Sequence, residues 1–286
     1  MSTTTTTTTT TTDNLRDFTG KVVVITGSSS CIGAAAALEF ATAGAQVVVV
    51  GRNRERIASV AKQCADISPT GLAGLEIVAD ITDDEDCKRL IDETIGAFNR
   101  LDVLVNNAGY GVSAAVTDED FTRKLDQMIG LHVRSLIQLT RLSVPYLTKT
   151  NGNIVNISSL AAFHYTKSFG PYCIAKCAQD MYSKCAAVEL SKLGIRVNTI
   201  NPGLTRTGIM TQAGVPQLVS DQLFDKWGSK LPLGRPGDAR EVARAIRFLA
   251  SGEASFITGT GLTVDGGHLA ANTDLTVDEV IANNLK

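Results

Sequence analysis

The chain has 286 residues, which suffices for one large α/β domain or two smaller ones. Hydrophobic residues at 44% and charged residues at 20% are typical of a soluble globular protein. The net charge of −2, without a basic block, argues against a nucleic-acid or anionic-membrane partner, and no apolar run approaches the ~18 residues of a membrane span.

The N-terminal segment is a polar, low-complexity tract from Thr3 to Thr12. It offers no apolar face that a folded core could bury, so we expect a disordered tail over residues 1–17. The tract also lacks the pattern of a signal peptide. Because the remainder shows no internal repeat and no linker, we expect a single folded domain over residues 18–286.

Short strands and helices alternate through the first half of this domain. Lys21–Ile25 is a continuous apolar run of the kind that is buried on both faces of a parallel sheet. Thr82 and Glu85 have the spacing of a capping box and predict the start of a helix. The expected elements are strands over 21–25, 46–50, 75–78 and 101–105, and helices over 32–43, 53–64 and from 82 onward.

The second half continues this alternation with longer helices. The expected elements are helices over 119–148, 172–192 and 238–250, and strands over 153–157, 196–200 and 262–264. Such an order indicates βαβ units with right-handed crossovers. We therefore predict an α/β fold, a single doubly wound domain whose parallel sheet of about seven strands is flanked by helices, with ligands at the carboxyl ends of the strands.

A turn rich in glycine and serine, from Thr26 to Gly33, joins the first strand to its helix. Glycines and small hydroxyl residues let the backbone approach a diphosphate, and the helix N-terminus offers free N–H groups and a positive dipole end. A turn of this kind is often no more than a connection. Its place at the first strand of a doubly wound sheet favours dinucleotide binding.

Tyr172 and Lys176 form a Tyr-x-x-x-Lys step, and Ser159 lies thirteen residues upstream of the tyrosine. On a helix, residues four apart share a face, with their Cβ atoms ~5–6 Å apart. A nearby ammonium favours the phenolate and lowers a phenol pKa of ~10 by roughly 1–3 units, toward the range of general acid–base catalysis. Ser159 could polarise the oxygen that receives the proton. Taken alone, the pair also fits ordinary helix-surface residues.

With these features in place, the chain resembles the short-chain dehydrogenase/reductase family from about Phe18 to His268. Each motif that carries the resemblance is modest alone, and together they are highly specific. They are Thr26-Gly27…Gly33, Asp80, Asn106-Asn107-Ala108-Gly109, Ser159, Tyr172…Lys176, Pro202-Gly203 and Asp265-Gly266-Gly267. The resemblance implies a Rossmann-like domain, a nicotinamide cofactor and hydride transfer to or from a carbonyl or alcohol.

The same resemblance implies roles for individual residues. Tyr172 would be the general acid–base, Lys176 would lower its pKa and hold the nicotinamide ribose, and Ser159, with Ser158 as the alternative, would bind the substrate oxygen. Tyr172 and Lys176 would also belong to the cofactor site. The other cofactor-binding residues that it implies are Gly27, Ser28, Ser29, Ser30, Cys31, Ile32, Gly33, Arg52, Asn53, Asp80, Ile81, Asn107, Ala108, Gly109, Pro202, Gly203, Leu204, Thr205 and Thr207.

The end of the second strand bears on the choice of cofactor. It reads Gly51-Arg52-Asn53, without the acidic residue that would bind the 2′-hydroxyl of NAD. The Arg52 guanidinium suits a 2′-phosphate, and Ser28 and Asn53 could add hydrogen bonds. We therefore expect NADP rather than NAD, with a solvated arginine at a helix start as the alternative.

Two positions depart from the family pattern. Cys31 stands where the glycine turn usually has glycine, and its side chain could crowd the diphosphate or be tolerated as a small residue. His132 stands where relatives often carry an asparagine that anchors a water of the proton relay. A relay through a histidine, which titrates near ~6.5, would add a pH dependence there. The alternative is a histidine that only packs in its helix.

The six cysteines show no C-x-x-C pair and no histidine-rich neighbour, so we expect free thiols, no metal site and a reducing, cytoplasmic compartment. The moderately apolar stretch Thr205–Lys230, which includes Ile209 and Met210, suits a mobile lid over a small or medium hydrophobic carbonyl or secondary alcohol. The family resemblance also implies a homodimer or homotetramer formed by the long helices.

Two other functions stay open. One is a cofactor-binding protein of the same family with little or no catalysis, acting as a sensor or scaffold, which Cys31 and His132 would support. The other is a non-redox lyase or epimerase on the same fold. Ser159, Tyr172 and Lys176, all present at the required spacing, favour the active oxidoreductase.

Overall fold

In a computed structural model of the chain, we describe residues 17–208, 211, 215–273 and 275. The threonine tract therefore lies outside the described residues, as do Ile209 and Met210 of the expected lid. Among the described residues, no helix is long and apolar enough to cross a membrane.

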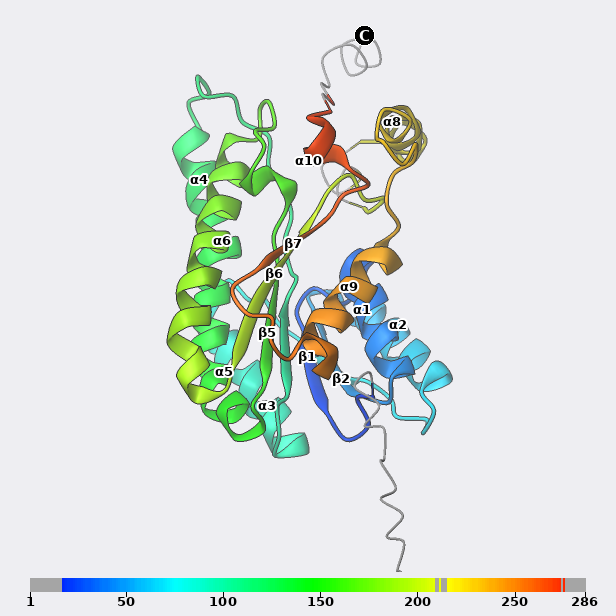
Figure 1. The fold of residues 1–286 in the computed structure, drawn as a ribbon, viewed down its shortest axis with the longest axis vertical. Helices are drawn as coiled ribbons and strands as arrows, with labels where there is room; N and C mark the ends of the chain where they lie inside the picture. Colours follow the sequence, from blue (N-terminus) through cyan, green and yellow to red (C-terminus); the bar gives the residue numbers. More distant parts are fainter. Residues whose placement is uncertain (1–16, 209–210, 212–214, 274, 276–286) are drawn as a thin grey trace, which may run out of the picture.

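A parallel sheet of seven strands forms the centre of the molecule (Figure 1). Its order is β3-β2-β1-β4-β5-β6-β7, so the chain first builds outward from β1 in one direction and then in the other. The strands are β1 (Val22–Ile25), β2 (Gln46–Gly51), β3 (Leu75–Val78), β4 (Val103–Asn106), β5 (Asn153–Ile157), β6 (Arg196–Pro202) and β7 (Gly261–Val264). The predicted doubly wound fold is confirmed.

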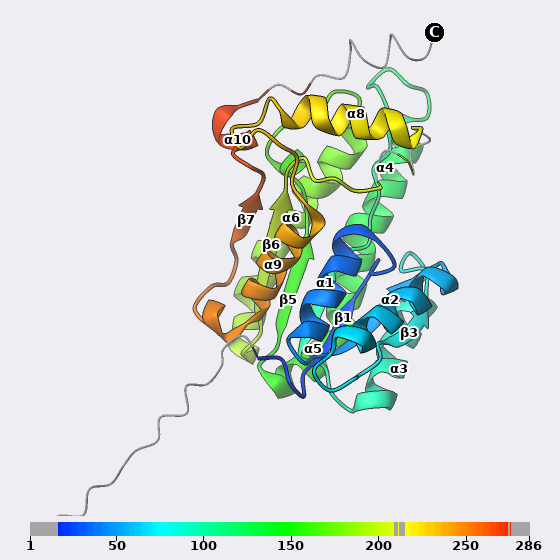
Figure 2. The same cartoon turned by 90° about the vertical axis from the view of Figure 1, so that its right-hand side faces the viewer.

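Helices cover both faces of the sheet (Figures 1 and 2). On one face lie α1 (Cys31–Thr42), α2 (Arg54–Ile67) and α9 (Ala239–Ala250), and on the other lie α3 (Asp84–Phe98), α4 (Phe121–Ile129), α5 (Ser135–Thr150) and α6 (Gly170–Leu190). Side chains of β1 alternate between the two cores: Val23 and Ile25 pack with α1, whereas Val22 and Val24 face the layer that contains α3. Burial on both faces explains why the central strands β1 and β2 are continuous apolar runs.

The boundary predicted at Thr82 is wrong by one residue. Asp83, not Thr82, caps α3, because its carboxylate accepts hydrogen bonds from the backbone N–H groups of Glu85 and Asp86 at 2.8 and 3.0 Å. The Thr82 hydroxyl instead donates to Asp80 Oδ1 at 2.7 Å. Two adjacent residues could each serve as the cap, and the local hydrogen bond of Thr82 to Asp80 leaves the cap to Asp83.

The long helix predicted over 119–148 is divided by a π-helical segment, Gly130–Arg134, which links α4 to α5 and contains His132. Such one-turn insertions in an α-helix often occur at functional sites. The short 3-10 segments are Leu160–Ala162, Ser191–Leu193 and Gly252–Ala254.

The stretch expected to form a lid contains a helix that the sequence analysis did not predict. This helix, α8 (Gln217–Gly228), buries Leu223, Phe224 and Trp227. Arg206 attaches the preceding loop to it by ion pairs with Asp221 and Asp225. A four-residue helix, α10 (His268–Ala271), follows β7 and lies near α8 above the end of the sheet (Figure 2).

Candidate active site

One large cleft of ≈ 1200 Å³ opens at the carboxyl ends of the strands. The glycine turn after β1, the ends of β2 to β6 and the start of α6 contribute to its lining. Among its lining residues are His132, Ser159, Tyr172 and Lys176, together with every residue expected to bind the cofactor except Ser28. The fold therefore brings the sequence motifs to one place.

The glycine turn is held by close packing against the turn that follows β4. A Cβ atom on Gly33 would lie 2.4 Å from the Gly27 carbonyl oxygen and 2.5 Å from Asn107 Nδ2, so only glycine fits. Asn107 Nδ2 donates to the carbonyl oxygens of Thr26 and Gly27 at 2.9 and 3.2 Å. Because the backbone is exposed to the cleft at the N-terminus of α1, this turn fits the diphosphate of a dinucleotide.

Ser28, expected among the cofactor-binding residues, is buried and does not belong to the lining of the cleft. Its side chain is fully buried, and its hydroxyl donates to the Ile25 carbonyl at 2.7 Å and accepts from the Val50 N–H at 2.8 Å. The serine therefore joins β1 to β2 beneath the cleft. In the sequence it could not be distinguished from its neighbours Ser29 and Ser30, both of which line the cleft.

Cys31 adopts a backbone conformation that normally requires glycine. Its φ is +50°, in the left-handed region, which costs a residue with a Cβ atom roughly 1–2 kcal/mol. Its thiol sulfur accepts a hydrogen bond from the backbone N–H of Gly208 at 3.1 Å. The side chain thus contacts the loop after β6, a partner that the sequence did not reveal.

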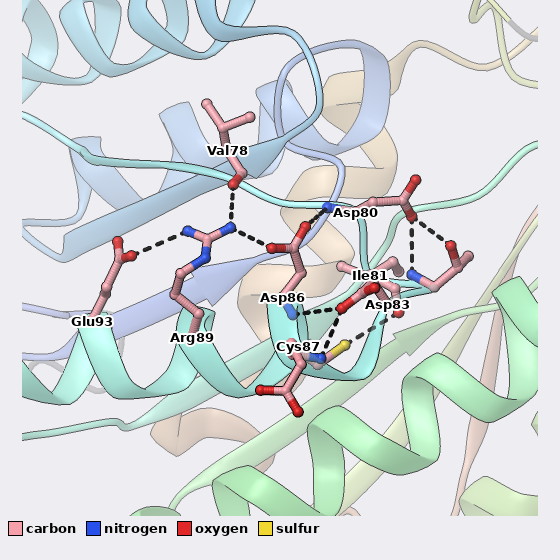
Figure 3. A network of polar contacts seen from close by, with 10 residues as sticks. Val78, Asp80, Ile81, Asp83, Asp86, Cys87, Arg89 and Glu93 are labelled. Atoms are coloured by element: carbon pink, nitrogen blue, oxygen red, sulfur yellow. Dashed lines mark hydrogen bonds and ion pairs between the residues drawn. The ribbon is translucent and has the colours of Figure 1, made fainter.

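A network of polar contacts fixes Asp80 at the end of β3 (Figure 3). The Asp80 N–H donates to Asp86 Oδ2 at 2.8 Å, and Arg89 binds both Asp86 and the Val78 carbonyl. Partial burial opposes ionisation of Asp80, but hydrogen bonds from Thr82 outweigh it and the carboxyl pKa lies below its usual value. Asp80 is therefore a fixed anion in the cleft.

Arg52 extends from the end of β2 toward this anion. Its Nη1 lies 3.7 Å from Asp80 Oδ2, yet 71% of the arginine side chain stays exposed. Asn53 uses its Oδ1 to cap α2 by accepting from the Arg56 N–H at 2.8 Å. The end of β2 therefore presents an accessible guanidinium to the cleft.

Tyr172 and Ser159 meet in the cleft, since the tyrosine is in the first turn of α6 and the serine follows β5. Burial raises the pKa of Tyr172 to about 12, and the hydrogen bond with Ser159 only partly opposes this. The expectation of a lowered tyrosine pKa is therefore wrong for the ligand-free protein. Burial of the hydroxyl is the largest influence on the tyrosine pKa.

Lys176 is buried beneath Tyr172, with its Nζ 5.5 Å from the centre of the tyrosine ring. Burial lowers the lysine pKa to about 7, and the nearby Asp180 only partly opposes this. Nζ donates to the Ile157 carbonyl at 2.9 Å and to Gln179 Oε1 at 3.0 Å. The lysine is thus poised between its charged and neutral forms near neutral pH.

Three buried residues of the site were missed by sequence reasoning: Gln179, Asp180 and Asn201. Asn201 Nδ2 donates to Asp180 Oδ2 at 2.8 Å and to the Ser159 carbonyl at 3.3 Å, so it supports the backbone that presents Ser159. A signal did exist, because Gln179 and Asp180 follow Lys176 by three and four residues and so share its helix face.

His132 is buried, and its Nε2 is 2.8 Å from the Tyr110 carbonyl oxygen. Burial and then the charge of Lys176 lower the imidazole pKa well below its usual value. The expected relay that titrates near ~6.5 is therefore not supported. His132 packs edge-on against Tyr172, with ring centres 5.4 Å apart.

A small cavity of ≈ 10 Å³, room for about one water, shares His132 and Ile157 with the lining of the large cleft. Its lining includes Thr26, Asn106, His132 and Gln179. No group of three or more histidine, cysteine, aspartate or glutamate side chains within the described residues could hold a metal ion.

Comparison with known proteins agrees with this geometry. A family model described as enoyl-(acyl carrier protein) reductase matches residues 27–268. L-fucose dehydrogenase of Bos taurus is 36% identical over 250 residues, which are 87% of this chain and 90% of that protein. The 3-oxoacyl-[acyl-carrier-protein] reductase FabG of Thermotoga maritima is 35% identical over 254 residues, 87% of this chain and 97% of that protein.

A solved structure is similar over the same region. The structure of a short-chain dehydrogenase/reductase from Caenorhabditis elegans, determined with cofactor, has a TM-score of 0.84 and 33% sequence identity to this chain. The match covers 88% of this chain and 96% of that one.

Proposed function

Because the chain belongs to the short-chain dehydrogenase/reductase family and is an NAD(P)-dependent oxidoreductase of alcohol and carbonyl groups, we propose that it uses NADP and that Tyr172 is its general acid–base. The observation that carries the proposal is the convergence of Ser159, Tyr172 and Lys176 in a cleft whose other end is a glycine turn. Bound there, the nicotinamide would supply or accept the hydride.

The chain's own residues perform the proton chemistry. In the direction of reduction, the Tyr172 hydroxyl donates its proton to the substrate oxygen, which the Ser159 hydroxyl also binds. The hydrogen bond between Ser159 and Tyr172 lowers the tyrosine pKa, so the serine assists ionisation. Lys176, when protonated, lies close enough to the Tyr172 ring to stabilise the phenolate. The lysine pKa of about 7 lets this side chain gain or lose a proton during turnover.

The cofactor would be held along the carboxyl ends of the strands. Ser29, Ser30, Ile32 and the backbone of the glycine turn would bind the diphosphate. The adenine would lie over Asp80 and Ile81, and the adenosine ribose would pack against Asn107, Ala108 and Gly109. The nicotinamide half would contact Tyr172, Lys176, Pro202, Gly203, Leu204, Thr205 and Thr207, all of which line the cleft.

NADP preference rests on Arg52. Its exposed guanidinium and the missing acidic residue at the end of β2 favour a 2′-phosphate. Isothermal titration should find tighter binding of NADP than of NAD, and Arg52→Ala should weaken NADP binding with little change for NAD. Tighter binding of NAD by the wild type would reject the assignment.

We propose a small or medium carbonyl or secondary alcohol as substrate, since the relatives include dehydrogenases and reductases of such groups. A panel of these compounds, followed through NAD(P)H absorbance, tests the activity. Cys31, strained in the glycine turn, favours the alternative of a cofactor-binding protein with little catalysis. Cofactor binding without turnover on the whole panel would support that alternative.

The proposal also includes a homodimer or homotetramer and a cytoplasmic location. The location is proposed because the six cysteines form no C-x-x-C pair, a pattern that fits a reducing compartment.

A further inference from the structure

The Lys176 ammonium nitrogen has two hydrogen-bond acceptors, and one of them belongs to a side chain. Gln179 Oε1 accepts from Nζ at 3.0 Å, while the Ile157 carbonyl accepts at 2.9 Å. Gln179 is itself fixed, because its Nε2 donates to the same Ile157 carbonyl at 3.1 Å and its side chain is buried. Lysine, glutamine and the end of β5 thus form a closed triangle beneath the catalytic tyrosine.

His132 has no hydrogen bond to Lys176 that could replace this contact. Its Nε2 is bonded to the Tyr110 carbonyl, and its ring packs edge-on against Tyr172. Gln179, in contrast, touches Lys176 directly and lines the cavity with room for about one water together with Asn106 and His132. Gln179 therefore connects the lysine with this small cavity.

We propose that Gln179 is a positioning residue, which holds the Lys176 ammonium beneath Tyr172 and sets the proton affinity of the lysine. The proposal rests on the function proposed above. An amide oxygen can accept from the charged lysine but carries no charge, so it favours the protonated form only moderately.

The titratable side chains near Lys176, within the described part of the chain, lie on two elements. Tyr172 and Asp180 lie on α6, and His132 lies on the π-helical segment. Asp180 raises the lysine pKa, but its Oδ2 is already engaged by Asn201. His132 is kept neutral by burial. Gln179 is thus a neutral polar neighbour of Lys176, and a substitution at this position can introduce a charge or remove the hydrogen bond while Tyr172 stays unchanged.

Two substitutions of similar size change the contact in opposite ways. Gln179→Glu places a carboxylate beside the ammonium and should raise the apparent lysine pKa by roughly 1–3 units, as a titration of the coupled pair. Gln179→Met removes the acceptor and should lower it. The readout is the Cε signal of Lys176 in the ligand-free protein labelled with [13C]lysine, assigned by its absence from Lys176→Met and followed over pH by NMR.

Ser183→Ala is the matched control, because Ser183 lies one turn further along α6 and donates to the Gln179 backbone carbonyl at 2.8 Å without touching the lysine. Ser183→Ala should lower the melting temperature and leave the apparent pKa of Lys176 unchanged. Opposite displacements in the two Gln179 variants support the proposal. An unshifted titration in both, or shifts of the same sign, would overturn it. Should Gln179→Met fail to fold, Gln179→Glu alone decides by the presence or absence of an upward shift.

The NMR titration does not depend on turnover, so it separates this proposal from the function on which it rests. Where the enzyme is active, the pH–rate profiles should shift in the same directions as the lysine signals. If the lysine pKa shifts in opposite directions in the two variants but the protein turns over no substrate, the role proposed for Gln179 stands and the proposed catalytic function is rejected.

Discussion

At the scale of single residues, burial governs the chemistry around Tyr172. The sequence placed a lysine near the tyrosine, and a simple Coulomb argument then lowers the phenol pKa. The structure buries Lys176 and partly buries Tyr172, and desolvation raises the tyrosine pKa to about 12 and lowers the lysine pKa to about 7. Each shift favours the neutral form. Spacing along a helix can identify such a pair, but it carries no information about the solvent around it.

The depressed lysine pKa predicts a pH-dependent stability of the ligand-free protein. Between pH 7 and the ordinary lysine value of 10.5, Lys176 is protonated in the unfolded chain and neutral in the folded one. The free energy of unfolding therefore increases as the pH rises through this range. Lys176→Met lacks the effect. Its gain in melting temperature over the wild type should be largest near pH 7 and shrink toward pH 9.

Differential scanning fluorimetry over this range measures that gain. Lys184→Met, at an exposed position of the same helix, is the control for loss of a lysine. A gain from Lys176→Met that stays constant with pH would contradict a buried lysine whose pKa is near 7.

At the scale of elements, the motif order predicted the sheet well and the connections less well. All seven strands were predicted, most clearly β1 and β2, whose continuous apolar runs are buried on both faces. The π-helical segment at His132 and helix α8 were missed. Their conformations depend on tertiary contacts, such as the His132 bond to Tyr110 and the attachment of Arg206 to α8, that no local pattern encodes.

The glycine turn shows the same limit at a point where it affects function. The sequence identified Cys31 as unusual, but only its φ of +50° reveals the reason. Cys31→Gly should relieve roughly 1–2 kcal/mol of left-handed strain, offset by about 0.5–1 kcal/mol for glycine flexibility. The net gain lies between zero and about 1.5 kcal/mol, each kcal/mol corresponds to roughly 2–4 °C in melting temperature, and removal of the side chain should tighten NADP binding.

Thermal melts and isothermal titration check this pair of effects. Cys185→Gly, at an exposed position inside α6, is the control and should instead lose about 1 kcal/mol of stability. A Cys31→Gly protein that is less stable than the wild type and binds NADP no better would show that the thiol contact with Gly208 matters more than the strain.

At the scale of the whole molecule, the sheet order explains why distant motifs form one site. The strand order reverses between β1 and β4, and the loops on either side of this point carry the glycine turn and the Asn107 turn. The motif spacing predicted which residues belong together. It could not show that Ser28 faces the interior, because a turn of three serines has no periodicity.

The outer face of α6 carries an exposed apolar stripe, which the proposed homodimer or homotetramer would bury. Ile174, Met181 and Val188 recur every seven residues, two turns of the helix, and are all exposed. Met181→Lys should weaken assembly and reduce the mass measured by light scattering after gel filtration. Lys62→Glu, on α2 at the opposite face, is the control. An unchanged mass for Met181→Lys would exclude this stripe as the interface.

The most direct test of the central claim compares wild type with Tyr172→Phe for turnover on the best substrate of the panel and for NADP binding by titration. The substitution removes only the hydroxyl that exchanges the proton. We predict a loss in kcat of roughly 10²–10⁴-fold with NADP affinity largely retained. Turnover by Tyr172→Phe at a rate close to that of the wild type would contradict the assignment of Tyr172 as the general acid–base.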